Sequence, residues 1–198
     1  GFSIVHDHWK IPRIAGHVPH ETSLASLTED EQEEVMGLSP TLKEIVQRYN
    51  LFYHTPSDRL DTDSLLVGHH FDDAIYSQLY FGYGGDDSPG DRRVVSREVE
   101  RRILAYAPET ILVLVKTSRD IIARRMQESP HVREVLKETD IEYVLARFED
   151  GFNQSMIQNK IIIDTSSATV DQSVGELVEN IGSYLTQRDR IRMLTKDF

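Results

Sequence analysis

The stretch SLLVGHHFDDAIYSQLYFG, residues 64–82, joins a short apolar run to a helical pattern. The run at residues 64–68 does not alternate apolar with polar side chains, which is typical of a parallel strand covered on both faces. A glycine ends the run, and two histidines and two aspartates follow it. The stretch therefore predicts a strand–helix unit with a polar cluster at the carboxyl end of the strand.

Three further runs have the same character, at residues 2–6, 110–116 and 160–164. Each precedes at least one helical pattern, as in right-handed β–α–β crossovers. The 198 residues, of which 39% are hydrophobic, are enough to bury one sizeable core. The sequence therefore predicts an α/β fold in which residues 1–198 form a single domain. We expect a doubly wound, mostly parallel sheet with helices on both faces.

Several helix starts are marked by polar residues. Ser39 and Pro40 predict the start of one helix. Capping-box spacing predicts three more, at Thr117-x-x-Asp120, Thr139-x-x-Glu142 and Thr169-x-x-Gln172. Apolar periodicity then predicts the buried faces. For the first helix we expect burial of Leu42, Ile45, Val46 and Tyr49. For the last two the expected stripes are Ile141, Val144, Leu145, Phe148 and Phe152, and Val174, Leu177, Val178, Ile181 and Leu185.

The composition excludes several classes of function. A formal net charge of −11 disfavours binding to nucleic acid or to an anionic membrane, because both need cationic contacts. No apolar run approaches the roughly 20 residues of a membrane-spanning helix. The absence of cysteine excludes disulfides, thiolate zinc sites and cysteine nucleophiles. The composition is compatible with a cytoplasmic location and with a homodimer.

Two histidine–aspartate clusters follow predicted strands, HDHW at residues 6–9 and HHFDD at residues 69–73. If the two strands are neighbours, both clusters leave the same edge of the sheet, where ligands bind in parallel α/β folds. One interpretation makes the aspartates first-turn acids that favour the helix dipole. A second makes His6, His8, His69 or His70 metal ligands, although no spacing matches a specific zinc motif. The third is a substrate pocket lined by Trp9 and the histidines.

The sequences APETILVLVKTSRDIIARRM and IIIDTSSATVDQSVGELVENI carry a family resemblance. They resemble the fourth strand, the last strand and the following helices of the P-loop nucleoside and nucleotide kinases, the group of thymidylate kinase and deoxynucleoside kinases. The resemblance implies that Arg124 and Arg125 touch the transferred phosphate. It also implies that Thr165, Ser166 and Ser167 border the adenine, with ATP and Mg²⁺ as cofactors and a nucleoside or nucleotide as the ligand.

The first half resembles the same family less closely. HHFDDAIYSQLYFG takes the place of a segment that begins with Asp-Arg or Glu-Arg-Ser in the family. The resemblance implies substrate contacts for His69, His70, Asp72 and Tyr76. IVHDHW resembles the end of the family's second strand, which implies that Asp7 is the general base and that Trp9 lies nearby. Contacts to an acceptor phosphate are expected from Arg92, Arg93 and Arg97.

One departure from the family is severe, because the 198 residues contain no G-x-x-x-x-G-K-[ST] sequence. In the family this loop holds the β- and γ-phosphates and follows a central strand. The glycine-rich segment at residues 82–93 has no lysine and cannot replace it. We therefore expect this polypeptide to lack kinase activity. Either a front segment precedes these residues, or the sheet has closed in a different order.

Three hypotheses of function follow. The first is a kinase-like phosphotransferase of the thymidylate kinase type. The second is a non-catalytic relative that binds a small molecule or a partner. The third is a metal-dependent hydrolase that uses His6, His8, His69 and an aspartate.

Overall fold

The computed structural model describes residues 4–7, 28–56, 64–88, 90–130 and 135–195. The chain divides into two compact units. The first comprises Gly1–Pro108 with Arg133–Val135, and the second comprises Glu109–Val132 with Leu136–Phe198. Each unit is an arrangement of helices with one pair of parallel strands.

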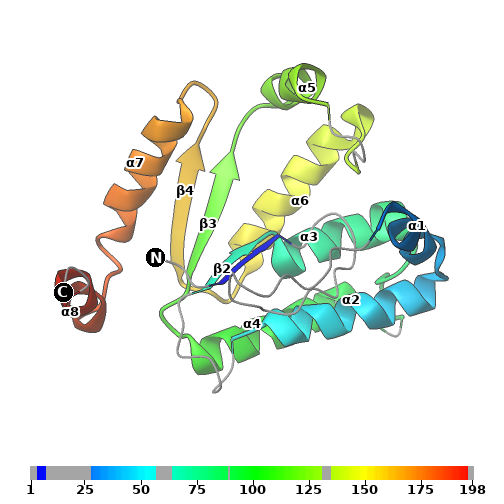
Figure 1. The fold of residues 1–198 in the computed structure, drawn as a ribbon, viewed down its shortest axis with the longest axis horizontal. Helices are drawn as coiled ribbons and strands as arrows, with labels where there is room; N and C mark the ends of the chain where they lie inside the picture. Colours follow the sequence, from blue (N-terminus) through cyan, green and yellow to red (C-terminus); the bar gives the residue numbers. More distant parts are fainter. Residues whose placement is uncertain (1–3, 8–27, 57–63, 89, 131–134, 196–198) are drawn as a thin grey trace. The chain divides into compact units, whose positions relative to one another are not determined.

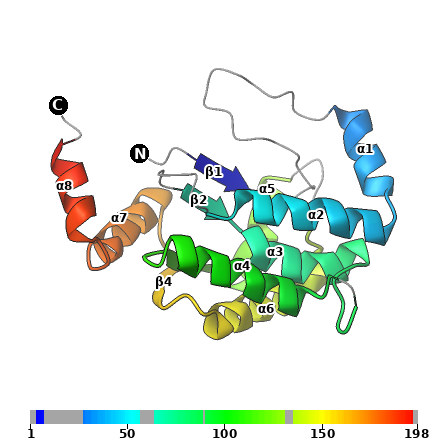
Figure 2. The ribbon, with the colours of Figure 1, turned by 90° about the horizontal axis from the view of Figure 1, so that it is seen from below.

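In the first unit, β1 (Ile4–Asp7) pairs in parallel with β2 (Ser64–Val67), and Asp7 lies opposite Val67. The two strands run parallel, as the sequence predicts, and they are neighbours, which is the condition on which the pocket hypothesis depends. The helices of this unit are α1 (Glu29–Gly37), α2 (Pro40–His54), α3 (His69–Tyr76), the π-helical turn η1 (Ser77–Phe81) and α4 (Arg92–Tyr106). Helices α2, α3 and α4 pack against one another and lie side by side in Figure 2.

The core between α2, α3 and α4 contains many polar groups. Its apolar members include Leu51, Val99 and Ile103, all nearly inaccessible to solvent. Helix α2 begins at the predicted cap, Ser39, but its buried face is not the predicted one. Apart from Leu51, the buried side chains of α2 are Glu44, Gln47, Asn50 and His54.

The apolar row of α2 is largely exposed, and the prediction of its burial was wrong. Leu42 and Ile45 are each 47% exposed and Tyr49 is 64% exposed, whereas Val46 is half-buried. In this polar row Glu44 is buried against Arg92 of α4, and hydropathy along one helix does not reveal such a partner.

In the second unit, β3 (Ile111–Lys116) pairs in parallel with β4 (Asn159–Asp164). Helix α6 (Ile141–Gln154) packs on β3, and α7 (Val170–Ile181) packs on β4, as Figure 1 shows. The remaining elements are α5 (Arg119–Glu128), the short 3₁₀ turn η2 (Glu138–Asp140) and α8 (Gln187–Thr195).

The N-terminal caps of the helices in this unit agree only in part with those predicted from the sequence. Thr169 caps α7 in a full capping box with Gln172, as predicted. The cap of α5 is Ser118 rather than Thr117, because the Ser118 hydroxyl accepts from the Ile121 amide. At α6 the expected box at Thr139 does not form, because the preceding residues make the turn η2.

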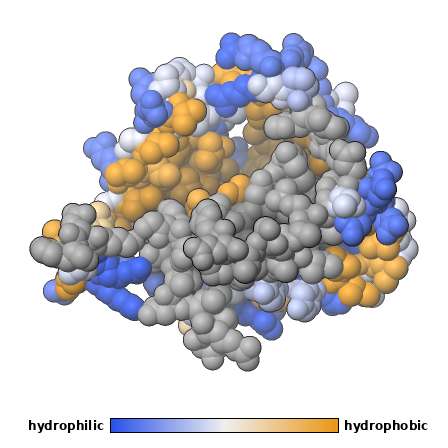
Figure 3. All heavy atoms as spheres, in the orientation of Figure 1, coloured by the Kyte–Doolittle hydropathy of each residue, from blue (hydrophilic) through white to orange (hydrophobic). Residues whose placement is uncertain are grey.

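The two predicted apolar stripes differ in burial. On α6, Ile141, Val144 and Phe152 are buried, which confirms that stripe. On α7, Val174 and Val178 are 52% and 65% exposed, so the expected burial of these two residues was wrong. Figure 3 shows apolar side chains gathered on this face of the second unit.

The described strands and helices thus make a mixed α/β structure with parallel strands and flanking helices. Within the described residues, the four strands form two separate pairs rather than one sheet.

Candidate functional site

The turn from β2 into α3 has an unusual backbone. Gly68 has a φ of +70° and His69 a φ of +47°, so two successive residues lie in the left-handed region. At Gly68 the conformation is natural, and a Cβ there would collide with the Asp72 carboxylate. At His69 a left-handed backbone costs on the order of 1–3 kcal/mol and persists only where surrounding contacts hold it. The turn is therefore strained at the carboxyl end of a parallel strand, where α/β proteins place functional groups.

The contacts that hold His69 come from its imidazole. Its Nε2 lies 3.2 Å from the carbonyl oxygen of Leu51 on α2, and its Nδ1 lies 3.2 Å from Nδ1 of His70. The other nitrogen of His70, Nε2, lies 3.3 Å from Oε1 of Glu100 on α4. Both histidines are 3% exposed. The predicted substrate residues His69 and His70 are therefore together, but they face the packed helices rather than solvent.

A second buried cluster surrounds Arg92, whose side chain is 1% exposed. Its Nε lies 2.5 Å from Oδ2 of Asp73, and its Nη1 lies 2.8 Å from Oε1 of Glu44. The Tyr83 hydroxyl donates to Oδ1 of Asp73 at 2.8 Å, and the guanidinium stacks 4.8 Å from the Tyr83 ring centre. Arg92 thus joins α2, α3 and α4, and it does not present a free cation to an acceptor phosphate.

Burial changes the acid–base behaviour of this cluster. Burial raises the pKa of Asp73, and the Arg92 guanidinium and the Tyr83 hydrogen bond oppose that rise. Burial also raises the pKa of Tyr83, with further contributions from the neighbouring Asp73 carboxylate. The pKa of Tyr76 is raised by burial and by the nearby Asp72 charge, so this phenol stays protonated at neutral pH.

The remaining predicted residues of the first unit are dispersed. Asp72 and Tyr76 are buried on α3, and the Tyr76 ring stacks on Tyr80 with centroids 5.9 Å apart. Arg97 is exposed on α4. Trp9 and the side chain of Asp7 lie outside the described residues, so the predicted pocket between Trp9 and the histidines stays a prediction.

Arg93, another residue expected at an acceptor phosphate, lies at the start of α4 and binds acidic residues of the preceding loop. Its guanidinium reaches Asp91 at 2.7 Å and Asp86 at 3.2 Å. Asp91 caps α4 through the Arg93 amide, and hydrogen bonds from Arg93 lower the pKa of Asp91 to about 2.

In the second unit, two of the predicted site residues lie in contact. The Arg125 guanidinium donates to the carbonyl oxygen of Thr165 at 3.0 Å and to its hydroxyl at 3.4 Å. The neighbouring Arg124 points elsewhere, and its Nε lies 3.7 Å from Glu128 one helical turn away. Thr165 follows β4 directly, and its amide and hydroxyl both donate to the Lys116 carbonyl at the end of β3.

The loop after Thr165 is ordered by its own side chains. The Ser166 amide donates to Oδ1 of Asp164 at 2.8 Å, and hydrogen bonds from Ser166 lower the pKa of Asp164. Ser167 is exposed, and Thr169 then starts α7. The carboxyl ends of β3 and β4 therefore carry a polar loop with a cation beside it.

A metal centre finds no support in the described part of the chain. That part contains no group of three histidine, aspartate or glutamate side chains arranged to hold a metal ion. The side chains of His6 and His8 lie outside it. Within it, the ring nitrogens of His69 and His70 are directed at each other, at Leu51 and at Glu100.

Sequence reasoning missed Glu44 and Glu100. A signal for the first was present: residues 44, 47, 51 and 54 recur on one side of α2 and are mostly polar, opposite the apolar row. Glu100 has no such signal, because its partner His70 is 30 residues away in the sequence.

Comparison with known proteins produced no match, either to a family model, to a curated protein or to a solved structure. Among the helices of the described residues, none has both the length and the apolar character required to cross a bilayer.

Proposed function

We propose that the chain is a nucleoside or nucleotide kinase-like phosphotransferase, inactive over these 198 residues, whose nucleotide lies at the carboxyl ends of β3 and β4. The observation that carries the proposal is the contact between Arg125 and Thr165. The two positions are 40 residues apart in the sequence. The family resemblance assigns both positions to one nucleotide, Arg125 to the transferred phosphoryl group and Thr165 to the adenine at the opposite end of the molecule.

The residues at this edge fit a nucleotide in charge and in hydrogen bonding. Arg125 is an exposed cation on α5, and Thr165, Ser166 and Ser167 supply hydroxyl groups in one loop. An arginine fork is suited to phosphate oxygens, and its charge stabilises a transferring phosphoryl group. When bound, ATP supplies that phosphoryl group, with Mg²⁺ neutralising its oxygens.

The test is nucleotide binding, with adjacent arginines as a matched pair. Binding of adenosine and of ATP to the 198-residue chain is followed by amide chemical shifts in NMR spectra. We expect Arg125→Ala to weaken ATP binding by about tenfold, the equivalent of ~1.4 kcal/mol. Adenosine binding should change less, because the lost contact is to phosphate. Arg124→Ala, which removes only an exposed pair with Glu128, should change neither by more than about twofold.

Two outcomes would contradict the proposal. One is the absence of saturable shifts at residues 165–167 with either ligand. The other is an equal loss of ATP affinity in the two variants, which would indicate a general effect of charge.

A second candidate, a non-catalytic binding relative, is favoured by the histidines of α3. They occupy the place of the family's arginine, and both are buried in contacts within the protein. Nucleotide binding separates the two candidates, because a relative that binds another ligand or a partner gives no saturable shifts at residues 165–167 with adenosine or ATP.

A further inference from the structure

The contacts of His69 and His70 require a definite number of protons. A carbonyl oxygen only accepts hydrogen bonds, so Nε2 of His69 carries the proton in its 3.2 Å contact with Leu51. The contact between the two Nδ1 atoms needs a second proton, on either ring. The contact between Nε2 of His70 and Oε1 of Glu100 needs a third, on the ring or on the carboxyl group.

Two neutral imidazoles and an ionised carboxylate carry only two protons between them. With two, at least one of the three contacts would bring two acceptors together in a buried place, which is costly because neither can reach water. With three, every contact is a hydrogen bond and the set of three side chains has no net charge. The position of the third proton belongs to the set and not to one residue.

Acidic groups outnumber basic ones among the other buried side chains of the three packed helices. The other buried titratable groups there are Glu44 and His54 of α2, Asp72, Asp73 and Tyr76 of α3, and Asp91 and Arg92 at the start of α4. Of these, the guanidinium of Arg92 is already paired with both Asp73 and Glu44. A histidine–glutamate set without net charge adds no further carboxylate charge to this core.

We propose that His69, His70 and Glu100 form a binding site for one proton, and that this proton holds the strained first turn of α3 against α2 and α4. The backbone observation is independent of the proton count. His69 has a φ of +47°, a conformation that its side-chain contacts to Leu51 and His70 must maintain. Loss of the proton removes one hydrogen bond from the row that joins Leu51, His69, His70 and Glu100. The turn after β2 is then no longer held in its strained conformation.

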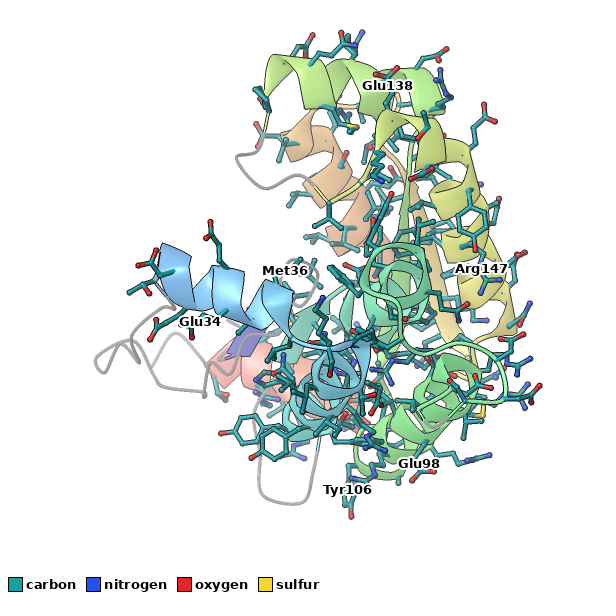
Figure 4. All side chains as sticks on the ribbon, turned by 90° about the vertical axis from the view of Figure 1, so that its right-hand side faces the viewer. Glu34, Met36, Glu98, Tyr106, Glu138 and Arg147 are labelled. Carbon is teal, nitrogen blue, oxygen red and sulfur yellow. The ribbon has the colours of Figure 1, made fainter. Side chains whose placement is uncertain are left out.

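A single substitution tests the proton count. Glu100→Gln keeps the shape of the side chain, and the amide can donate to Nε2 of His70. Two neutral imidazoles then satisfy all three contacts without a third proton. The matched control is Glu98→Gln on the same helix, which removes the same charge from a side chain 45% exposed that projects outward from α4 (Figure 4).

The measurement is the unfolding constant in urea from about pH 6.5 to pH 8.5 for the full chain and both variants. The folded wild type holds one more proton than folded Glu100→Gln, whereas the unfolded chains hold equal numbers in this range. The ratio of the wild-type unfolding constant to that of Glu100→Gln should therefore rise by about tenfold per pH unit. The same ratio for Glu98→Gln should stay flat. A flat ratio for Glu100→Gln overturns the proposal.

A second measurement on the wild type needs no variant to fold. Spectra of protein labelled with ¹⁵N in histidine and ¹³C in the glutamate carboxyl report which nitrogens and which carboxyl group carry protons. We expect three protons on the set of His69, His70 and Glu100 at neutral pH. Two neutral rings with an ionised Glu100 at that pH overturn the proposal.

Discussion

Arg92 and Asp73 form a buried ion pair that fastens α4 to α3. The Arg92 Nε lies 2.5 Å from Oδ2 of Asp73, and both side chains are 1% exposed. Two charges removed from water in this way are costly to separate, since a lone buried charge has no compensation. The pair therefore determines how the start of α4 sits on the strained helix α3.

Asp73→Asn should lower the free energy of unfolding by about 3 kcal/mol, because it leaves the buried guanidinium with Glu44 as its only remaining anionic partner among the described residues. Asp86→Asn is the matched control in the same unit. Asp86 is 63% exposed and 3.2 Å from Arg93, so its loss should cost less than about 1 kcal/mol. Urea unfolding of both variants measures the difference. Similar losses in the free energy of unfolding would show that the buried ion pair contributes no more to stability than the exposed one.

Gly84→Ala and Gly85→Ala should differ sharply in stability. Gly84 has a φ of +77°, and a Cβ there would lie 2.6 Å from Cγ of Arg92 and 2.9 Å from the Ser77 hydroxyl. At Gly85 a Cβ would meet nothing within 4 Å. We expect a loss of about 1–3 kcal/mol for the first and under about 0.5 kcal/mol for the second, by thermal and urea unfolding. Equal stabilities would mean that the loop can move away from Arg92 without cost.

The strands and their parallel pairing were accessible from the sequence, because a short apolar run without alternation that leads into a helical pattern is typical of a parallel strand. All four predicted strands occur, with ends shifted by at most two residues. The caps at Ser39 and Thr169 were equally local, since each depends on one hydroxyl and an amide three residues on.

The polar core could not be predicted in the same way. Glu44 lies in a helix whose apolar row points to solvent, and it is buried because Arg92, 48 residues later, reaches it. Such a pair stabilises the fold only when both residues are in contact. Neither residue, taken alone in the sequence, indicates that it is buried. Arg125 and Thr165, which the resemblance assigns separately, lie in contact because each follows a strand of the same parallel pair.

Acid should weaken the start of α4 through Asp91. Its folded pKa of about 2 lies below the ordinary value of 3.8, so its contribution to stability is complete above about pH 4 and is lost as the pH falls through 2. Asp91→Asn lacks this contribution at every pH. Thermal unfolding at about pH 5, 4 and 3 should show the gap between wild type and variant narrow from about 1–2 kcal/mol below pH 4. A gap that stays constant down to the lowest of these pH values would contradict this assignment.

The last prediction concerns turnover by the 198-residue chain. Phosphoryl transfer depends on positioning and on neutralising phosphate charge, and a G-x-x-x-x-G-K-[ST] loop supplies most of both in P-loop enzymes. This polypeptide contains no such sequence, and Arg92, one of its candidate phosphate ligands, is held by Asp73 and Glu44. We therefore expect no ADP release above the rate of ATP hydrolysis in buffer, across a panel of nucleosides and nucleotides, even at concentrations where ATP binding is seen. Acceptor-dependent ADP release that Arg125→Ala abolishes would contradict this expectation. It would show that other residues of the chain bind the β- and γ-phosphates in place of the missing loop.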